Sequence, residues 1–270
     1  MVPRAIPRVH PALALIDFRC VPSVGAVQAA LTTPFPVYVL HVKVGYEARA
    51  AHMRDVLARE ALEADWVLDF DIPDLDSKHL AEWFQDGMAT ACATTSCAAK
   101  HLEAWRRLLK SQAAGALVLE DDMFLSADFR SALTAMLEEA ESRHSLRGKP
   151  YVLSLENSGL RFVPKQEREE GRLLYPNTLI RCAGAYYVSK EAAAIFIAGA
   201  KTDRVGAPLD WFMNAFFPDR VQLYWCHPTI AEQGSHNGKF RSGIDHKKDG
   251  LLRKLSWNAQ RWFKSKFRSR

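Results

Sequence analysis

Three consecutive carboxylates, Glu120, Asp121 and Asp122, follow directly on the apolar run Gly115 to Leu119. Acids this close repel one another unless a cation neutralises them, and oxygen ligands favour Mg²⁺ or Mn²⁺ over zinc. Alternate residues of an extended chain point the same way, so Glu120 and Asp122 are predicted to share one ion while Asp121 faces elsewhere. Such an ion completes its shell with phosphates, which makes a nucleotide diphosphate a natural partner. The alternative is that the acids stabilise the start of a following helix.

Motifs of several other chemistries are missing from the sequence. No G-x-G-x-x-G follows the first predicted strand, and there is no Walker A sequence and no G-x-S-x-G elbow. The closest cysteines, Cys92 and Cys97, lack the spacing and the second ligand pair of a structural zinc site. A dinucleotide oxidoreductase, a P-loop NTPase and an α/β-hydrolase are therefore disfavoured.

The acid triplet belongs to an alternation of predicted strands and helices. Strands are expected at 37–42, 66–70, 115–119, 151–155, 184–188 and 221–225, and helices at 46–63, 97–112, 127–142, from 189, and around 210. Thr95 or Ser96 is expected to cap the second helix. The alternation predicts an α/β fold with a mostly parallel central sheet and helices on both faces. Ligands of such sheets bind at the carboxyl ends of the strands, where the acid triplet stands.

Length and composition favour one domain between two atypical ends. The chain has 270 residues, of which 48% are hydrophobic, enough for one sizeable core. Residues 1–35 are expected to form an irregular extension, residues 36–246 the globular domain and residues 247–270 a basic tail. No apolar run approaches the roughly 18 residues of a spanning helix, and prolines interrupt any signal-peptide core. These features predict a cytoplasmic protein.

The net charge of +5 is distributed unevenly. Residues 247–270 carry a charge of +8, which leaves −3 for residues 1–246. On a helical wheel the basic side chains of the tail oppose an apolar side made of Leu251, Leu252, Leu255, Ala259, Trp262, Phe263 and Phe267. This pattern is typical of an interfacial helix and predicts binding to an anionic membrane surface. Docking on the protein's own body and nucleic-acid binding are the less favoured alternatives.

Several short motifs follow one another in a characteristic order between residues 37 and 244. They are Val39 to Lys43 with Arg49, the helix residues Cys97, His101 and Trp105, Leu119 to Asp122, Gly184 to Ser189, Pro208 to Asp210, and Pro228 to Gln233 with Ser235. This ordered set resembles glycosyltransferase family 25, the lipopolysaccharide and lipooligosaccharide biosynthesis enzymes. His41, Ser96 and Lys100 depart from the family pattern, which bears on the donor sugar more than on the reaction.

The resemblance implies a GT-A-like fold and inverting transfer from a UDP-sugar, UDP-galactose being favoured, to a saccharide or lipid-linked glycan acceptor. It implies Mn²⁺ or Mg²⁺ at Glu120 and Asp122, with Asp121 near the ribose or the sugar. Inversion needs a base that takes the proton of the acceptor hydroxyl. Asp210 is the first candidate and Glu232 the second, although Asp210 can also be an ordinary N-terminal helix residue.

Further residues are expected to hold the donor or acceptor. Arg49 can pair with a phosphate, His101 matches the family's helix histidine, and Gln233 and Ser235 lie at a Gly-rich loop that can close over the donor. By residue type alone, an exposed helix arginine and a core histidine are the commoner interpretations of Arg49 and His101. The aromatic side chains of Tyr187, Trp211 and Trp225 can stack on sugars, but core packing is the commoner role.

Two competing functions stay open at this point. One is a catalytically silent relative that acts as a glycan-binding or adhesion module, against which the intact acid triplet and Asp210 argue. The other is a metal-dependent phosphoesterase, which would hydrolyse its substrate without an acceptor. The favoured prediction is a metal-dependent inverting glycosyltransferase of cell-surface glycan biosynthesis, peripheral on the cytoplasmic face of the membrane.

Overall fold

The structure, a computed structural model, describes residues 35–143, 146, 148–241 and 251–267. The extension predicted for residues 1–35 lies outside the described residues apart from Phe35, as do residues 247–250 and 268–270 of the predicted tail. All described residues belong to one compact unit, Thr32–Arg270.

A seven-stranded sheet forms the centre, in the order β2-β1-β3-β7-β5-β8-β6. Its strands are β1 (Val37–Leu40), β2 (Asp65–Val67), β3 (Gly115–Glu120), β5 (Tyr151–Ser154), β6 (Leu174–Asn177), β7 (Ala185–Ser189) and β8 (Gln222–Cys226). Five strands share one direction, and β7 and β6 run against them. The predicted α/β class is confirmed, and the sheet is mixed because no crossover helix precedes β7 to bring it in parallel.

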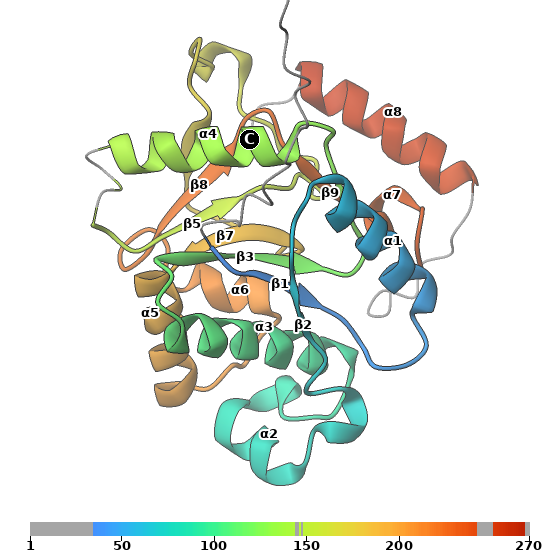
Figure 1. Cartoon of the computed structure of the whole chain (residues 1–270), viewed down its shortest axis with the longest axis vertical. Coiled ribbons are helices and arrows are strands. Elements are labelled where there is room, and N and C mark those ends of the chain that lie inside the picture. Colours follow the sequence, from blue (N-terminus) through green and yellow to red (C-terminus); the bar gives the residue numbers. More distant parts are fainter. Residues whose placement is uncertain (1–34, 144–145, 147, 242–250, 268–270) are drawn as a thin grey trace, which may run out of the picture. The chain divides into compact units, whose positions relative to one another are not determined.

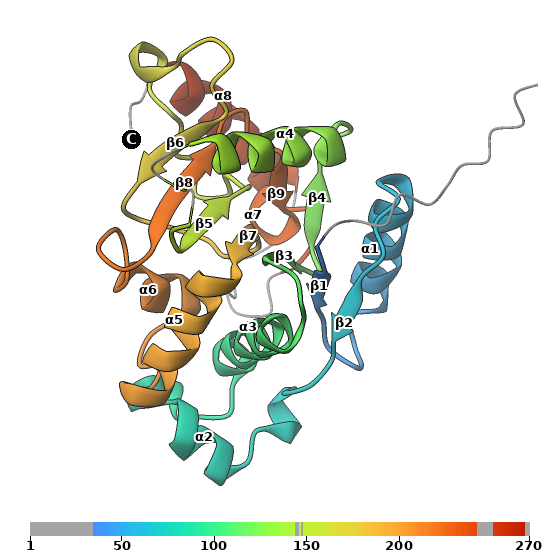
Figure 2. The same ribbon diagram turned by 60° about the vertical axis from the view of Figure 1, so that its left-hand side comes forward.

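Helices cover both faces of this sheet (Figures 1 and 2). They are α1 (Glu47–Arg59), α2 (Ser77–Trp83), α3 (Ala93–Lys110), α4 (Phe129–Ser142), α5 (Lys190–Thr202) and α6 (Leu209–Asn214), joined by 3₁₀ turns at Ile72–Asp74, Asp86–Met88 and Lys165–Glu167. Along β3, Ala116 and Val118 pack in the core with α3 and α5, whereas Leu117 and Leu119 pack with α1 and α4. Burial on both faces explains why this strand is apolar throughout.

Helix α3 begins earlier than its sequence pattern suggests. Cys92 precedes its first residue and makes no side-chain cap, so the predicted cap at Thr95 or Ser96 is wrong. Inside the helix, the hydroxyl of Thr95 donates to the carbonyl of Met88 at 3.0 Å and that of Ser96 to the carbonyl of Phe70 at 2.7 Å. These bonds fix the start of α3 to the preceding loops.

A small second sheet follows the acid triplet at once. It pairs β4 (Met123–Leu125) antiparallel with β9 (Ala231–Gln233), with Met123 opposite Gln233. After β9 come the short helix α7 (Gly234–Asn237) and, beyond the undescribed segment, α8 (Leu251–Phe267). This sheet therefore brings the C-terminal part of the domain beside the acids.

Helix α8 contacts the domain through part of its surface. Trp257 is 9% exposed, and Arg261 forms an ion pair with Glu232 of β9. By contrast, Trp262 and Phe263 are 57% and 53% exposed. Within the described residues, none of the helices combines the length and the apolar character that crossing a bilayer requires.

Candidate functional site

A cleft of about 600 Å³ opens at the carboxyl ends of β1 and β3. The loop after β1, the first turns of α1 and α3, the acid triplet and the β9–α7 junction form its walls. Six of the predicted site residues line it: Arg49, Glu120, Asp121, Asp122, Gln233 and Ser235. We call this space the acidic cleft.

Two neighbours contact Asp121, and one of them is the cationic side chain of Arg49. Its Oδ1 accepts from Nη1 of Arg49 at 2.7 Å, and its Oδ2 lies 2.7 Å from Nδ1 of His41. A second guanidinium nitrogen of Arg49 donates to the carbonyl of Arg241. Asp121 therefore lines the same cleft as Glu120 and Asp122. The sequence predicted that Asp121 would face the opposite side, but the chain turns after Glu120 instead of staying extended.

Glu120 and Asp122 form no ion pair with a lysine or arginine among the described residues. Oε2 of Glu120 accepts from Nε2 of Gln233 at 2.6 Å, and Oδ2 of Asp122 accepts from the backbone N–H of Ser235 at 2.9 Å. Burial, reinforced by Asp121, raises the pKa of Glu120 to about 7, and burial with the charge of Glu120 raises the pKa of Asp122 to about 6. The ionised forms of both carboxyls are thus underpaired.

The carboxyl of Asp122 has the chemistry of an incomplete cation site. Its Oδ1 is buried and has no hydrogen-bond partner among the residues that the structure describes. A hard divalent ion would supply this partner and lower the pKa values of both Glu120 and Asp122. These two side chains therefore fit the kind of ion that the sequence predicts.

A second set of possible metal ligands shares Glu120. One ligand atom each from Cys97, His101 and Glu120 lies within 4.8 Å of the others. Oε1 of Glu120 is 3.6 Å from Nε2 of His101 and 3.7 Å from Sγ of Cys97. A thiol and an imidazole suit zinc better than Mg²⁺.

The hydrogen bonds around His101 indicate which of its ring nitrogens carries the proton. The hydroxyl of Tyr186 accepts from Nε1 of Trp105 at 3.0 Å and lies 2.8 Å from Nδ1 of His101. Because the hydroxyl proton is buried, His101 Nδ1 is its natural acceptor, which leaves the ring proton on Nε2, facing Glu120. Burial lowers the pKa of His101 to about 3, so the ring is neutral. In this tautomer Nε2 carries the ring proton, and it has no hydrogen-bond partner among the described residues because Oε1 of Glu120 lies 3.6 Å away. A metal would bind this nitrogen only after the proton had moved to Nδ1.

The two candidate bases lie outside the walls of the acidic cleft. Asp210, at the start of α6, accepts from the backbone N–H of Trp211 at 2.9 Å, and burial raises its pKa. The next residue, Trp211, is 63% exposed, so it is not a core residue. Glu232 is ion-paired with Arg261 and is separated from the cleft by the alternation of side chains along β9.

Sequence reasoning treated two cleft residues only as departures from a pattern. His41 lies directly after β1 and contacts Asp121, and Lys100 on α3 is 3% exposed and pairs with Asp71 at 2.8 Å. The position of His41 at the carboxyl end of a parallel strand was the signal that could have identified it. Lys100 carried no such signal, because its partner lies in a loop far along the chain.

Comparison with known proteins identifies a family. The sequence model of glycosyltransferase family 25 (LPS biosynthesis protein) matches residues 38–213, more than half of the chain. No curated protein matches the chain. The match covers β1, the start of α3 and the acid triplet, which build most of the acidic cleft. The chain therefore belongs to glycosyltransferase family 25, the family of lipopolysaccharide biosynthesis proteins.

Proposed function

We propose that the protein is an inverting glycosyltransferase that moves a sugar, with galactose favoured, from a UDP-sugar to a saccharide acceptor. The pathway would be lipopolysaccharide, lipooligosaccharide or other cell-surface glycan synthesis, in keeping with the family. The observation that carries this proposal is the pair of underpaired carboxyls, Glu120 and Asp122, at the strand ends of the acidic cleft. A GT-A-like arrangement would place the donor in this cleft.

Each side chain of the cleft has a role in this proposal. Glu120 and Asp122 hold Mn²⁺ or Mg²⁺, which when bound neutralises the diphosphate and the charge of the departing UDP. Asp121, fixed by Arg49 and His41, accepts hydrogen bonds from ribose or sugar hydroxyls. Gln233 orients the carboxyl of Glu120 by a hydrogen bond, and the neutral ring of His101 lies beside that carboxyl. Ser235 orients Asp122 through its backbone N–H.

Asp210 is the preferred base for the acceptor hydroxyl. Burial raises its pKa, which makes its carboxylate a stronger base than that of an exposed aspartate, and the exposed Trp211 beside it offers a flat apolar surface to a sugar ring. Glu232 is second because Arg261 holds its carboxylate. In Asp210→Asn we expect the kcat to fall at least about 100-fold with little change in donor KM, whereas Glu232→Gln keeps most of the kcat.

We place the enzyme on the cytoplasmic face of the membrane, held there by residues 247–270. The described part of this segment supports the idea, since Trp262 and Phe263 are more than half exposed next to Arg261 and Lys264. Aromatic and basic side chains side by side on a helix favour an anionic bilayer surface. A lipid-linked glycan would then be presented at the same surface as the enzyme.

The test follows UDP release from a panel of UDP-sugars with Mn²⁺, with and without saccharide acceptors. Release that requires an acceptor and that falls at least about 100-fold in Asp122→Asn supports the proposal. Asp128→Asn is the matched control, since Asp128 is exposed and makes no side-chain cap. Release without any acceptor would indicate a phosphoesterase, and binding of the donor without turnover would indicate a silent relative. Either result contradicts the proposed transfer.

A further inference from the structure

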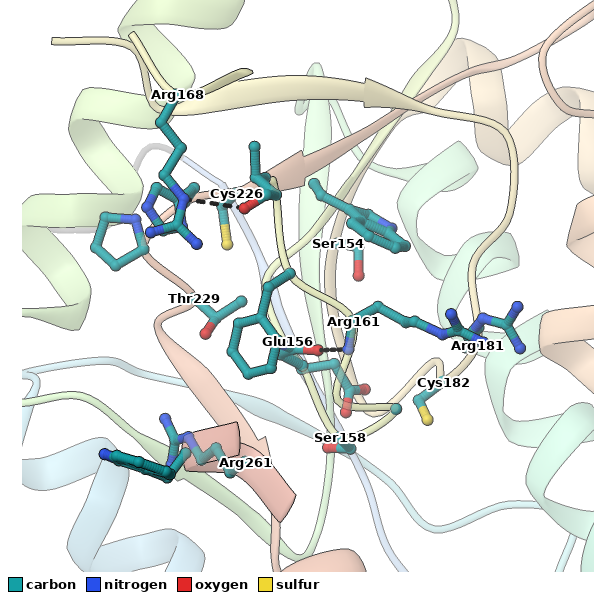
Figure 3. A pocket seen from close by; sticks show the side chains of 18 of the residues that line it. Ser154, Glu156, Ser158, Arg161, Arg168, Arg181, Cys182, Cys226, Thr229 and Arg261 are labelled. Carbon is teal, nitrogen blue, oxygen red and sulfur yellow. Dashed lines mark hydrogen bonds between the residues drawn. The ribbon is translucent and has the colours of Figure 1, made fainter. Parts of the chain in front are cut away.

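A second cavity, of about 620 Å³, opens further along the same edge of the sheet, at the carboxyl ends of β5 and β8 (Figure 3). Its walls come from the segments after these two strands, the segment before β7, and α8. The aromatic side chains of Phe162, Trp225 and Trp262 contribute to the lining. The volume and the aromatic lining suit an organic ligand of one or two sugar rings.

The charges of this cavity are strongly unequal, and we call it the basic cavity. Five cationic side chains line it, against the single carboxyl of Glu156: Arg161, Lys165, Arg168, Arg181 and Arg261. Figure 3 shows the arginines on different sides of the view, with Glu156 between them.

Three of these cationic groups have neither an ion pair nor a side-chain hydrogen bond with any residue in the described ranges. Arg261 pairs with Glu232, and Nε of Arg168 donates to the carbonyl of Val163 at 2.9 Å. Arg161, Lys165 and Arg181 form no ion pair with any residue in the described ranges. Several cations around one cavity repel one another, and a bound anion would relieve that repulsion.

One layer of side chains separates the basic cavity from the acidic cleft. The hydroxyl of Ser158, in the basic cavity, accepts from the backbone N–H of Gln233 at 3.0 Å, and the amide of Gln233 in turn holds Glu120. Glu156 accepts from the backbone N–H groups of Gly184 and Ala185, and the carbonyl of Gly184 accepts from the N–H of Glu120. Ligands in the two cavities would therefore lie on opposite sides of this layer. Asp210, the proposed base, is near both sides, since its charge adds to burial in raising the pKa of Glu120 in the acidic cleft and of Cys182 in the basic cavity.

We propose that the basic cavity is the acceptor site and that it takes a saccharide carrying a phosphate or carboxylate group, bound by Arg161 and Arg181. The assignment rests on the proposed glycosyl transfer, since only a second substrate needs a site next to the donor. Guanidinium groups bind planar or tetrahedral oxyanions through paired hydrogen bonds, and the aromatic walls cover the apolar faces of the sugar rings. A neutral saccharide would leave the cations unpaired.

Direct binding tests the site without any turnover. Full-length protein without donor is titrated by calorimetry with glucose, glucuronic acid and glucose 6-phosphate, which share a ring and differ in charge. We expect the anionic probes to bind about tenfold or more tightly than glucose at low salt, and the stronger of the two names the preferred group. In Arg161→Gln/Arg181→Gln the anionic probes should lose about tenfold in affinity and glucose less than twofold. In Lys110→Gln/Lys201→Gln, which removes two exposed cations outside the cavity, all three affinities should stay unchanged.

Two outcomes would overturn the acceptor site. Equal affinities for the three probes, or equal losses in the two double variants, would show that the cavity does not recognise anionic saccharides. Displacement of glucose 6-phosphate by UDP would show that the cavity holds the nucleotide instead. Titration with UDP and Mn²⁺ examines the donor separately: a wild-type protein that does not bind UDP contradicts the proposed function, whereas UDP binding without any preference for anionic sugars contradicts this inference alone.

Discussion

Glu120 takes part in two possible metal sites, and single residues distinguish them. Oδ1 of Asp122 and Nε2 of His101 are both buried without a hydrogen-bond partner among the described residues, but the carboxylate oxygen is an open acceptor, whereas the imidazole nitrogen carries the ring proton. We therefore expect Asp122→Asn to weaken Mn²⁺ binding by at least about tenfold, because it replaces a charged ligand by a neutral one, and Cys97→Ser to change it less than twofold. Calorimetric titration with MnCl₂ measures both. A larger loss in Cys97→Ser would locate the ion at the Cys97, His101 and Glu120 set.

Removing the ion should stop the reaction without unfolding the protein. Glu120 and Asp122 without a cation take up protons instead, since their pKa values are raised to about 7 and about 6. We expect EDTA to abolish acceptor-dependent UDP release and added Mn²⁺ to restore it, while the far-UV circular dichroism stays the same. Full activity in EDTA would exclude a role of the ion in the transfer.

Glu156 couples folding to pH. Burial raises its pKa from 4.5 to about 7, so the folded state holds the proton more tightly than the unfolded state. The stability that this group contributes is present in full below pH 4.5 and is lost as the pH rises through about 7, by roughly 3 kcal/mol in total. Glu156→Gln should remove this loss, because an amide oxygen can still accept from Gly184 and Ala185.

Urea unfolding between pH 4.5 and 8 measures that effect. The unfolding free energy of the wild type relative to Glu156→Gln should fall as the pH rises. Glu170→Gln, at an exposed carboxyl, should give a difference that does not depend on pH. Parallel pH profiles for the wild type and Glu156→Gln would show that the carboxyl is not protonated in the folded state.

Helices and strands with a clear hydrophobic pattern were predicted from the sequence, and those without such a pattern were missed. The apolar run of β3 predicts that strand within one residue, and the start of α5 was predicted within one residue at its cap, Ser189. Strand β6 and the β4–β9 pair have three or four residues each and polar or proline-containing sequences, so they have no period of their own. Their pairing comes from neighbours that are distant in sequence, which a local pattern does not contain.

The position directly before β7 requires a glycine. A Cβ at Gly184 would lie 2.8 Å from both Oε1 of Glu156 and Sδ of Met123. We expect Gly184→Ala to lower the unfolding free energy by about 1–3 kcal/mol, because Glu156 is fixed by two backbone N–H groups and cannot withdraw freely. Gly87→Ala is the control, since a Cβ there has no neighbour within 4 Å. Equal unfolding midpoints in urea would contradict the close approach.

At the scale of the whole molecule, the sequence predicted which residues form the candidate site better than it predicted which of them contact one another. The acid triplet could be picked out because strand ends collect ligands in α/β sheets, and Arg49 and Gln233 could be picked out through the resemblance to glycosyltransferase family 25. That Arg49 neutralises Asp121, and that Gln233 holds Glu120, depends on partners 72 and 113 residues apart. The basic cavity was missed for the same reason, since its cations come from separate loops and α8.

Charge and exposed apolar surface also act at the scale of the whole chain. The body carries a net charge of −3 and residues 247–270 carry +8, so an anionic bilayer should attract the protein by its C-terminal end. Phe263 is 53% exposed there and does not line the basic cavity. We expect Phe263→Ser to weaken binding of the full-length protein to phosphatidylserine-containing vesicles about fivefold, because an aromatic ring no longer enters the interface.

Vesicle flotation in low and high salt distinguishes charge-dependent membrane binding from non-specific hydrophobic adsorption. Trp211→Ser removes an aromatic side chain of α6 that is 63% exposed and lies outside residues 247–270, and it should leave flotation unchanged. Binding should weaken from 0.1 to 0.5 M NaCl, since the attraction between exposed charges is screened. Neutral phosphatidylcholine vesicles should bind poorly for the same reason. Equal losses in the two variants, or binding that ignores salt and lipid charge, would contradict membrane recruitment by the C-terminal segment.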